Sequence, residues 1–167
     1  MSCIVSRSAQ ASRSIDAPIE EVWKVLTGID NYSSWNPFVT NIVADSTVPT
    51  PGVQMTFTVV FPDQSVKTTK ELNQEYDPPQ QAEGSDEYTS KWVYTYDSWP
   101  SYLNMTKAIR VQTLTQKPGG PTEYFSKETY TGWLIWAIPL KQVQGGFDAQ
   151  ADALKSTCEE QAKQSSS

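Results

Sequence analysis

Between Thr122 and Gly132, a carboxylate and two phenols lie an even number of residues apart, at Tyr124, Glu128 and Tyr130. Successive side chains of a β-strand point to opposite faces, so these three residues would share one face of a strand. A carboxylate among apolar side chains is costly to desolvate, and its pKa rises unless it is paired. A raised pKa suits a group that transfers protons near neutral pH. Glu128 is therefore a candidate general acid or base.

The chain contains no histidine. This excludes the Ser-His-Asp and Cys-His nucleophile systems, the H-E-x-x-H zinc site and every His-ligated metal centre. Proton chemistry must use carboxylates, phenols, Lys, Cys or water. We expect no metal and no organic cofactor. Cys3 and Cys158 show no C-x-x-C spacing, and we expect both to be reduced thiols.

Two basic residues, Lys107 and Arg110, are candidates for a cationic partner of Glu128. In a strand they would lie on opposite faces, so only one of them can reach the interior. The sequence leaves open which one does. The inward residue would either form a salt bridge with Glu128 or stabilise an enolate or phenolate oxyanion of a ligand.

Length and composition predict one domain over residues 1–163, with a polar tail at 164–167. A net charge of −6 without a Lys/Arg cluster argues against binding to nucleic acid or to an anionic membrane surface. No apolar stretch approaches the roughly 20 residues of a membrane span, so we expect no integral membrane association. We expect a cytoplasmic protein because the N-terminus lacks the features of a secretory signal. The oligomeric state stays open.

The hydrophobic periodicity predicts helices at two places. A short helix begins near Pro18 and carries its apolar stripe on Val22, Val25 and Leu26. A helix of about 20 residues follows Leu140. Gly145-Gly146 lies within it, and we consider both a loop that delays the helix to Phe147 and a close approach of the backbone to a ligand.

Between these helices the chain is β-permissive, with turns that include Asp77-Pro78-Pro79. Short connections predict an antiparallel meander. The predicted strands, including one before the first helix, are Cys3–Ile15, Asn41–Ala44, Gln54–Phe61, Ser65–Glu75, Ser90–Tyr96, Met105–Gln116 and Thr122–Trp133.

The order of these elements and several motifs resemble the SRPBCC superfamily of START and birch-pollen-allergen-like proteins, closest to its polyketide cyclase/dehydrase-type branch. The motifs are Ile15–Leu26 with its A-P-x-E-x-V-W core, Tyr32–Phe38, Lys91–Tyr94, Glu128–Gly132 and the helix around Gly146-Phe147. The resemblance implies an α+β helix-grip fold. In this fold a curved antiparallel sheet wraps around a long C-terminal helix, and with two short helices it encloses a hydrophobic cavity.

The resemblance also implies which faces point inward and which residues border the cavity entrance. The catalytic candidates are Glu128, Tyr130 and Tyr94. Core packing is the alternative role for the aromatic residues, and Asp97–Pro100 is a candidate rim turn. The predicted ligand contacts are Trp35, Asn36, Phe38, Phe57, Trp92, Tyr96, Lys107, Tyr124 and Phe147.

Members of the superfamily include lipid and hormone carriers as well as aromatase/cyclases, and fold alone does not choose among them. Our leading hypothesis is a cofactor-independent enzyme that binds a hydrophobic, oxygenated small molecule. It would steer the cyclisation, dehydration or isomerisation of this molecule in polyketide-like metabolism. The alternative is a non-catalytic intracellular carrier of a lipid, quinone or pathway intermediate. A third hypothesis, an interaction module, predicts an exposed apolar patch and a filled interior.

Overall fold

The computed structural model describes residues 6–97 and 105–165, and within them seven antiparallel strands form one sheet in the order β1-β7-β6-β5-β4-β3-β2. The strands are β1 (Arg7–Ile15), β2 (Val39–Ala44), β3 (Gln54–Val60), β4 (Val66–Gln81), β5 (Tyr88–Asp97), β6 (Lys107–Gln116) and β7 (Thr122–Thr131). The helical elements are α1 (Ile19–Thr27), η1 (Ile29–Asn31), α2 (Tyr32–Trp35), η3 (Ile135–Ala137) and α3 (Leu140–Ser165). This is the predicted helix-grip fold.

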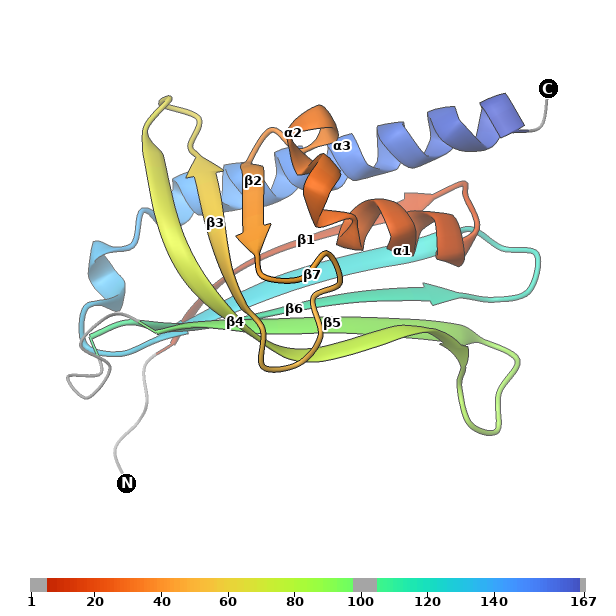
Figure 1. Ribbon diagram of the computed structural model, residues 1–167, viewed down its shortest axis with the longest axis horizontal. Helices are drawn as coiled ribbons and strands as arrows, with labels where there is room; N and C mark the ends of the chain where they lie inside the picture. The colour runs from red at the N-terminus through yellow and green to blue at the C-terminus, as the bar shows by residue number, and fades with distance from the viewer. Residues whose placement is uncertain (1–5, 98–104, 166–167) are drawn as a thin grey trace.

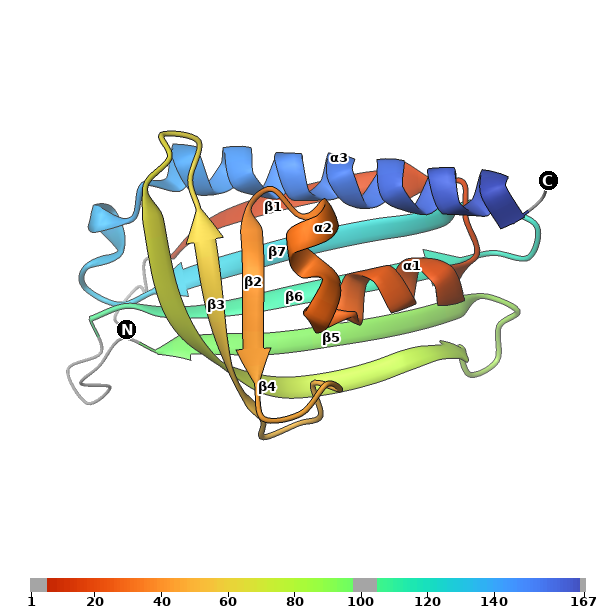
Figure 2. The ribbon, with the colours of Figure 1, turned by 45° about the horizontal axis from the view of Figure 1, so that its top comes forward.

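The long helix α3 lies along β1 on the concave side of the sheet (Figures 1 and 2). Strand β4 is strongly bent, and the sheet changes direction along it. As a result, β2 and β3 run at a steep angle to β5, β6 and β7 (Figure 2). The core fills the space between this curved face and the helices, with Trp92, Leu114, Phe147 and Leu154 among its fully buried side chains. Curvature of the sheet thus creates the interior that the site occupies.

The predicted start of the first helix near Pro18 is confirmed, because Pro18 is the N-cap residue of α1. Its fixed φ suits a helix start, and the acidic Glu20 and Glu21 in the first turn are favourable to the helix dipole. The buried side of α1 includes Val22 and Leu26, as the apolar spacing predicts. The helix ends before Gly28.

The predicted turn at Asp77-Pro78-Pro79 is wrong. Strand β4 continues to Gln81, and its pairing with β5 shifts in register between Asp77 and Gln80. The prolines cannot donate ladder hydrogen bonds, and the irregularity removes them from the pairing without ending the strand. The predicted strand from Cys3 is observed from Arg7, while Cys3 and the rim residues Ser98–Pro100 lie outside the described residues.

A loop at Gly145-Gly146 is also wrong, because α3 is continuous from Leu140. A Cβ atom on Gly146 would lie 2.2 Å from the ring of Phe38. The close backbone approach considered from the sequence therefore exists, but it is to Phe38 and not to a ligand. Phe38 in turn packs edge-on against Phe147, with ring centroids 6.0 Å apart. Glycine at this position lets the cavity wall and the long helix meet.

Candidate functional site

A cavity of about 230 Å³ lies between the sheet, the start of α3 and the segment that joins β7 to α3. Most of its wall is apolar, and its ionisable groups come from strands β4 to β7 of the sheet. Among the described residues the wall consists of Phe38, Val39, Phe57, Val59, Phe61, Lys67, Thr69, Glu71, Tyr94, Tyr96, Thr106, Arg110, Glu128, Tyr130, Leu134, Ala137, Ile138, Pro139 and Val143.

Glu128 lies on the inward face of β7 between the buried Ser126 and Tyr130. Desolvation raises the pKa of this carboxyl above its usual range. The positive charge of Arg110 and a hydrogen-bonding interaction with the Tyr130 hydroxyl oppose this rise. Glu128 is thus a partly buried carboxyl, and its negative charge is only partly compensated by its neighbours.

Glu71 is a second carboxyl in the same wall, and sequence reasoning missed it. It is 7% exposed on β4. Desolvation, followed by the negative charge of Glu128, raises the pKa of Glu71 to about 7. The two faces of the strand alternate as expected here, but the apolar residue is on the outer face: Leu72 is 42% exposed, while Glu71 and Asn73 point inward. The signal that could have identified Glu71 is a strand whose polar residues alternate with apolar ones and whose polar face could be the inner face.

The open choice between the two basic residues is resolved in favour of Arg110, which is 4% exposed and lines the cavity. Its Nε donates to Ser126 Oγ over 3.1 Å, and its Nη2 donates to Gln150 Oε1 over 3.0 Å. Its guanidinium also lies 4.0 Å from the centre of the Phe147 ring. No ion pair within 4.0 Å joins Arg110 to Glu128 in the described parts of the chain.

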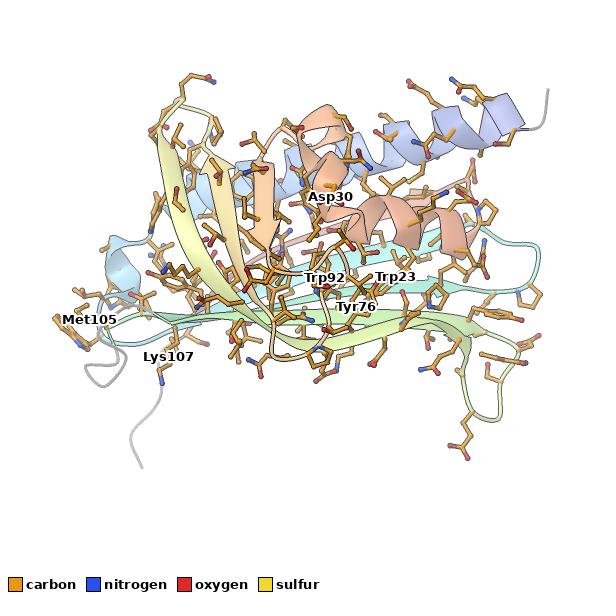
Figure 3. All side chains as sticks on the ribbon, in the orientation of Figure 1. Trp23, Asp30, Tyr76, Trp92, Met105 and Lys107 are labelled. Atoms are coloured by element: carbon orange, nitrogen blue, oxygen red, sulfur yellow. The ribbon has the colours of Figure 1, made fainter. Side chains whose placement is uncertain are left out.

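The structure places Lys107, a predicted ligand contact, outside the cavity wall. Lys107 opens β6 on the exposed face of the sheet, out of phase with the buried Ala108 and Arg110. Figure 3 shows its side chain extending away from the side of the sheet that α3 covers. The sequence alternation was correct, but it could not indicate which face was the inner one.

A chain of hydrogen bonds connects the cavity to the core below it. Gln112 Nε2 donates to the Tyr94 hydroxyl over 3.3 Å, and the Tyr124 hydroxyl donates to Gln112 Oε1 over 2.7 Å. Burial raises the pKa of both Tyr94 and Tyr124, so both phenols stay protonated near neutral pH. Tyr94 lines the cavity and can donate a hydrogen bond to a ligand, whereas Tyr124 lies behind it.

The cavity wall brings six of the predicted site residues together: Phe38, Phe57, Tyr94, Tyr96, Glu128 and Tyr130. The other predicted residues are not among the described residues of the wall; they are Trp35, Asn36, Trp92, Lys107, Tyr124 and Phe147. The sequence analysis did not identify the apolar wall residues in the connection between β7 and α3. This segment is short and has no periodicity that would place it over a cavity.

Trp35, Asn36 and Trp92, predicted as ligand contacts, have structural neighbours instead. Asn36 Oδ1 accepts hydrogen bonds from the backbone N–H groups of Phe38 and Val39, over 3.0 and 2.9 Å, and so shapes the turn into β2. The ring of Trp35 lies 5.0 Å from that of Tyr32.

The third residue, Trp92, belongs to the core under α1. It donates to Asn73 Oδ1 over 2.8 Å. Figure 3 shows it with Trp23 and Tyr76, away from Met105 at the end of the sheet. Trp23 and Tyr76 have ring centroids 5.1 Å apart, and Tyr76 is the strand-register partner of Trp92.

Within residues 6–97 and 105–165, no group of three or more Cys, Asp or Glu side chains is placed to hold a metal ion. No helix in the same described residues is long and apolar enough to cross a membrane. The polar groups of the cavity wall include the carboxyls of Glu71 and Glu128, the guanidinium of Arg110 and the phenols.

The sequence of residues 6–159 matches the model of the family described as polyketide cyclase / dehydrase and lipid transport. The chain belongs to this family. This membership agrees with the resemblance to the SRPBCC superfamily that the motifs indicated. Comparison with curated proteins gives no match.

Solved structures share the fold of this family member at low sequence identity. The di-domain ARO/CYC BexL from the BE-7585A biosynthetic pathway is 17% identical with a TM-score of 0.61, over 95% of this chain and 50% of that chain. Truncated norcoclaurine synthase from Thalictrum flavum is 13% identical with a TM-score of 0.59, over 94% and 96% of the two chains. Ara h 8.0201 is 15% identical with a TM-score of 0.56, over 91% and 99%.

Proposed function

We propose that this protein binds a hydrophobic, oxygenated small molecule in its cavity and promotes its cyclisation, dehydration or isomerisation. The observation that carries the proposal is the pair of carboxyls in the cavity wall, the buried Glu71 and the partly buried Glu128, beside the buried Arg110 in an otherwise largely apolar wall. Such groups are costly to bury, and a wall of this kind suits a ligand with an apolar body and a few oxygens. The family description, which names cyclases and dehydrases, supports the same chemistry.

Each polar group of the cavity wall has a separate role in the proposed reaction. Glu128, when ionised, removes a proton from the carbon next to a ligand carbonyl. Arg110 and the protonated phenols of Tyr94 and Tyr130 stabilise the enolate oxygen that forms. Glu71, with a pKa of about 7, is partly protonated at neutral pH and donates a proton to a departing hydroxyl. The apolar walls hold the reactive conformer and exclude water.

A binding role without catalysis is the second candidate. It is favoured by the lipid transport part of the family description and needs only the cavity. The class of enzyme, the biosynthetic setting, the cytoplasmic location and the single-domain organisation stay predictions.

Native mass spectrometry after incubation with a lipophilic extract of the source cells tests the two candidates. Retention and conversion of a species by the wild type, with retention but no conversion by Glu128→Gln, is the result expected of the enzyme. Glu83→Gln, on the exposed connection between β4 and β5, is the matched control and should behave as the wild type. A species retained and released unchanged favours the carrier. If no species is retained, both candidates are wrong.

A further inference from the structure

Two tryptophans are exposed in the connection between β7 and α3, next to the cavity. Trp133 is 63% exposed and Trp136 is 70% exposed. Their neighbours Leu134, Ala137 and Ile138 belong to the cavity wall. Large apolar side chains that are exposed close together in a segment often mark an interaction surface.

A further exposed apolar residue lies in a second segment beside the cavity wall. Val66, at the start of β4, is 64% exposed, and its neighbour Lys67 is part of the cavity wall. The tip of the β3–β4 hairpin, η3 and the start of α3 lie at one end of the molecule (Figures 1 and 2). Apolar side chains from two separate segments thus flank the same end of the cavity. We call Val66, Trp133, Leu134 and Trp136 the mouth patch.

Rigid placement supports a role for the patch as a surface. Arg7 donates to the carbonyl oxygens of Ile135 and Ile138, over 3.1 and 3.4 Å, and its guanidinium lies 5.3 Å from the centre of the Trp136 ring. The backbone N–H of Leu134 donates to the Met105 carbonyl over 2.9 Å. The tryptophans are therefore presented by a segment that is fastened to β1 and to the residues before β6.

The charge around the patch differs in sign from that of the whole chain. Arg7, Lys67 and Lys141 lie in the segments that carry or adjoin the mouth patch, and Asp63 is an acidic residue of the same segments. The chain as a whole has a net charge of −6. The start of α1, the β4–β5 connection and the end of α3 lie together at the opposite end of the molecule (Figure 1). In the sequence of these segments, acidic residues outnumber the lysines Lys24, Lys155 and Lys163; the acidic residues include Asp16, Glu20, Glu21, Glu83, Asp86, Glu87, Glu159 and Glu160.

We propose that the mouth patch docks on the surface of an anionic lipid bilayer, so that a lipophilic ligand passes between membrane and cavity without crossing water. Tryptophan suits the interface of a bilayer because it combines a large apolar ring with an N–H donor. Lysine and arginine near an anionic surface each add attraction that salt screens. The segregated charge also orients the protein, since the acidic end is repelled. The overall negative charge, which argued against an anionic surface, is concentrated away from the patch.

Co-sedimentation with vesicles tests this docking without a cavity ligand. The probes are vesicles of phosphatidylcholine with about 30% phosphatidylglycerol and vesicles of phosphatidylcholine alone, at low and at physiological salt. We expect binding to the anionic vesicles that weakens with salt. The double variant Trp133→Ser/Trp136→Ser should bind at least about tenfold more weakly, because each ring loses its burial in the interface. Tyr88→Ser is the matched control, since Tyr88 is 39% exposed elsewhere on the sheet.

A second pair of variants checks the electrostatic part. Lys67→Glu/Lys141→Glu should weaken binding to anionic vesicles by about thirtyfold or more, at roughly fivefold per lysine charge removed. Lys117→Glu, in the connection between β6 and β7, should bind as the wild type. Circular dichroism of every variant establishes that the fold is kept. Failure of the wild type to bind anionic vesicles, or equal binding by the tryptophan variant, overturns the proposal.

The inference rests on the proposed function for its purpose, because a lipophile in the cavity is what gives the docking a use. The two fail separately. A protein that converts or retains a ligand but ignores vesicles keeps its function and loses the docking site. If vesicles do not bind but an acidic protein binds the wild type and not the tryptophan variant, the patch belongs to a protein partner and the bilayer proposal is wrong.

Discussion

Replacing Glu71 by glutamine should stabilise the protein at neutral and alkaline pH. Burial raises the pKa of Glu71 from 4.5 to about 7, so the folded protein holds this proton more tightly than the unfolded chain does. A difference of this size corresponds to about 3 kcal/mol of free energy of unfolding, at 1.36 kcal/mol per pKa unit. Glu71 is 7% exposed, so solvent screening takes little from this value.

The direction of the pH dependence follows from where the proton sits. Below pH 4.5, Glu71 is protonated in both states and has no effect on stability. Between pH 4.5 and about 7 the unfolded chain releases the proton while the folded protein keeps it, so the free energy of unfolding falls as pH rises. Above about 7 the penalty is constant. Glutamine has a similar shape and no charge, so it removes the penalty.

Urea unfolding followed by tryptophan fluorescence from about pH 4 to about pH 8.5 measures this penalty. The stability of Glu71→Gln relative to the wild type should rise by about 3 kcal/mol across the range, with the change concentrated between pH 4.5 and about 7. Glu83→Gln, on the exposed β4–β5 connection, should show no such rise. A difference between Glu71→Gln and the wild type that does not depend on pH would refute the reasoning.

Two further changes in stability follow from the packing. Gly146→Ala should lower the free energy of unfolding by about 2 kcal/mol, because the new Cβ would lie 2.2 Å from the Phe38 ring. Gly145→Ala should raise it by about 1 kcal/mol, since the Cβ at this position has room. Urea unfolding of the two variants checks the sign of each change. Tyr124→Phe should cost about 2 kcal/mol, because it leaves Gln112 Oε1 buried without its donor, and an unchanged unfolding midpoint would contradict this.

The fold was largely predictable because its signals are local. The apolar stripe and Pro18 predicted α1, and the alternation between Thr122 and Thr131 predicted which residues of β7 share a face, while the family resemblance indicated that the face with Glu128 points inward. The failures occurred where tertiary contacts override local propensity. The prolines of β4 stay within the strand because β5 pairs on both sides of them, and Gly146 stays helical because Phe38 fills the space beside it.

The site was only half predictable, for a different physical reason. Glu128 stood out because aromatic residues flank it on the same face of its strand. Glu71 did not, because it alternates with Leu72, and burial of the apolar residue is the ordinary expectation. Lys107 and Arg110 lie on opposite faces of β6. The curvature of the whole sheet decides which of these faces is the inner one, and the sequence of a single strand does not contain that information.

The energetics of the cavity argue that its polar groups are there for a ligand. A core of this size would be more stable with apolar side chains in place of Glu71 and Glu128, since both carboxyls lose hydration and repel one another. Arg110 does not cancel this cost by direct pairing, because its hydrogen bonds go to Ser126 and Gln150. Those bonds instead hold the guanidinium in the cavity wall. A fold that keeps such groups around an open volume has an arrangement suited to polarising a bound molecule.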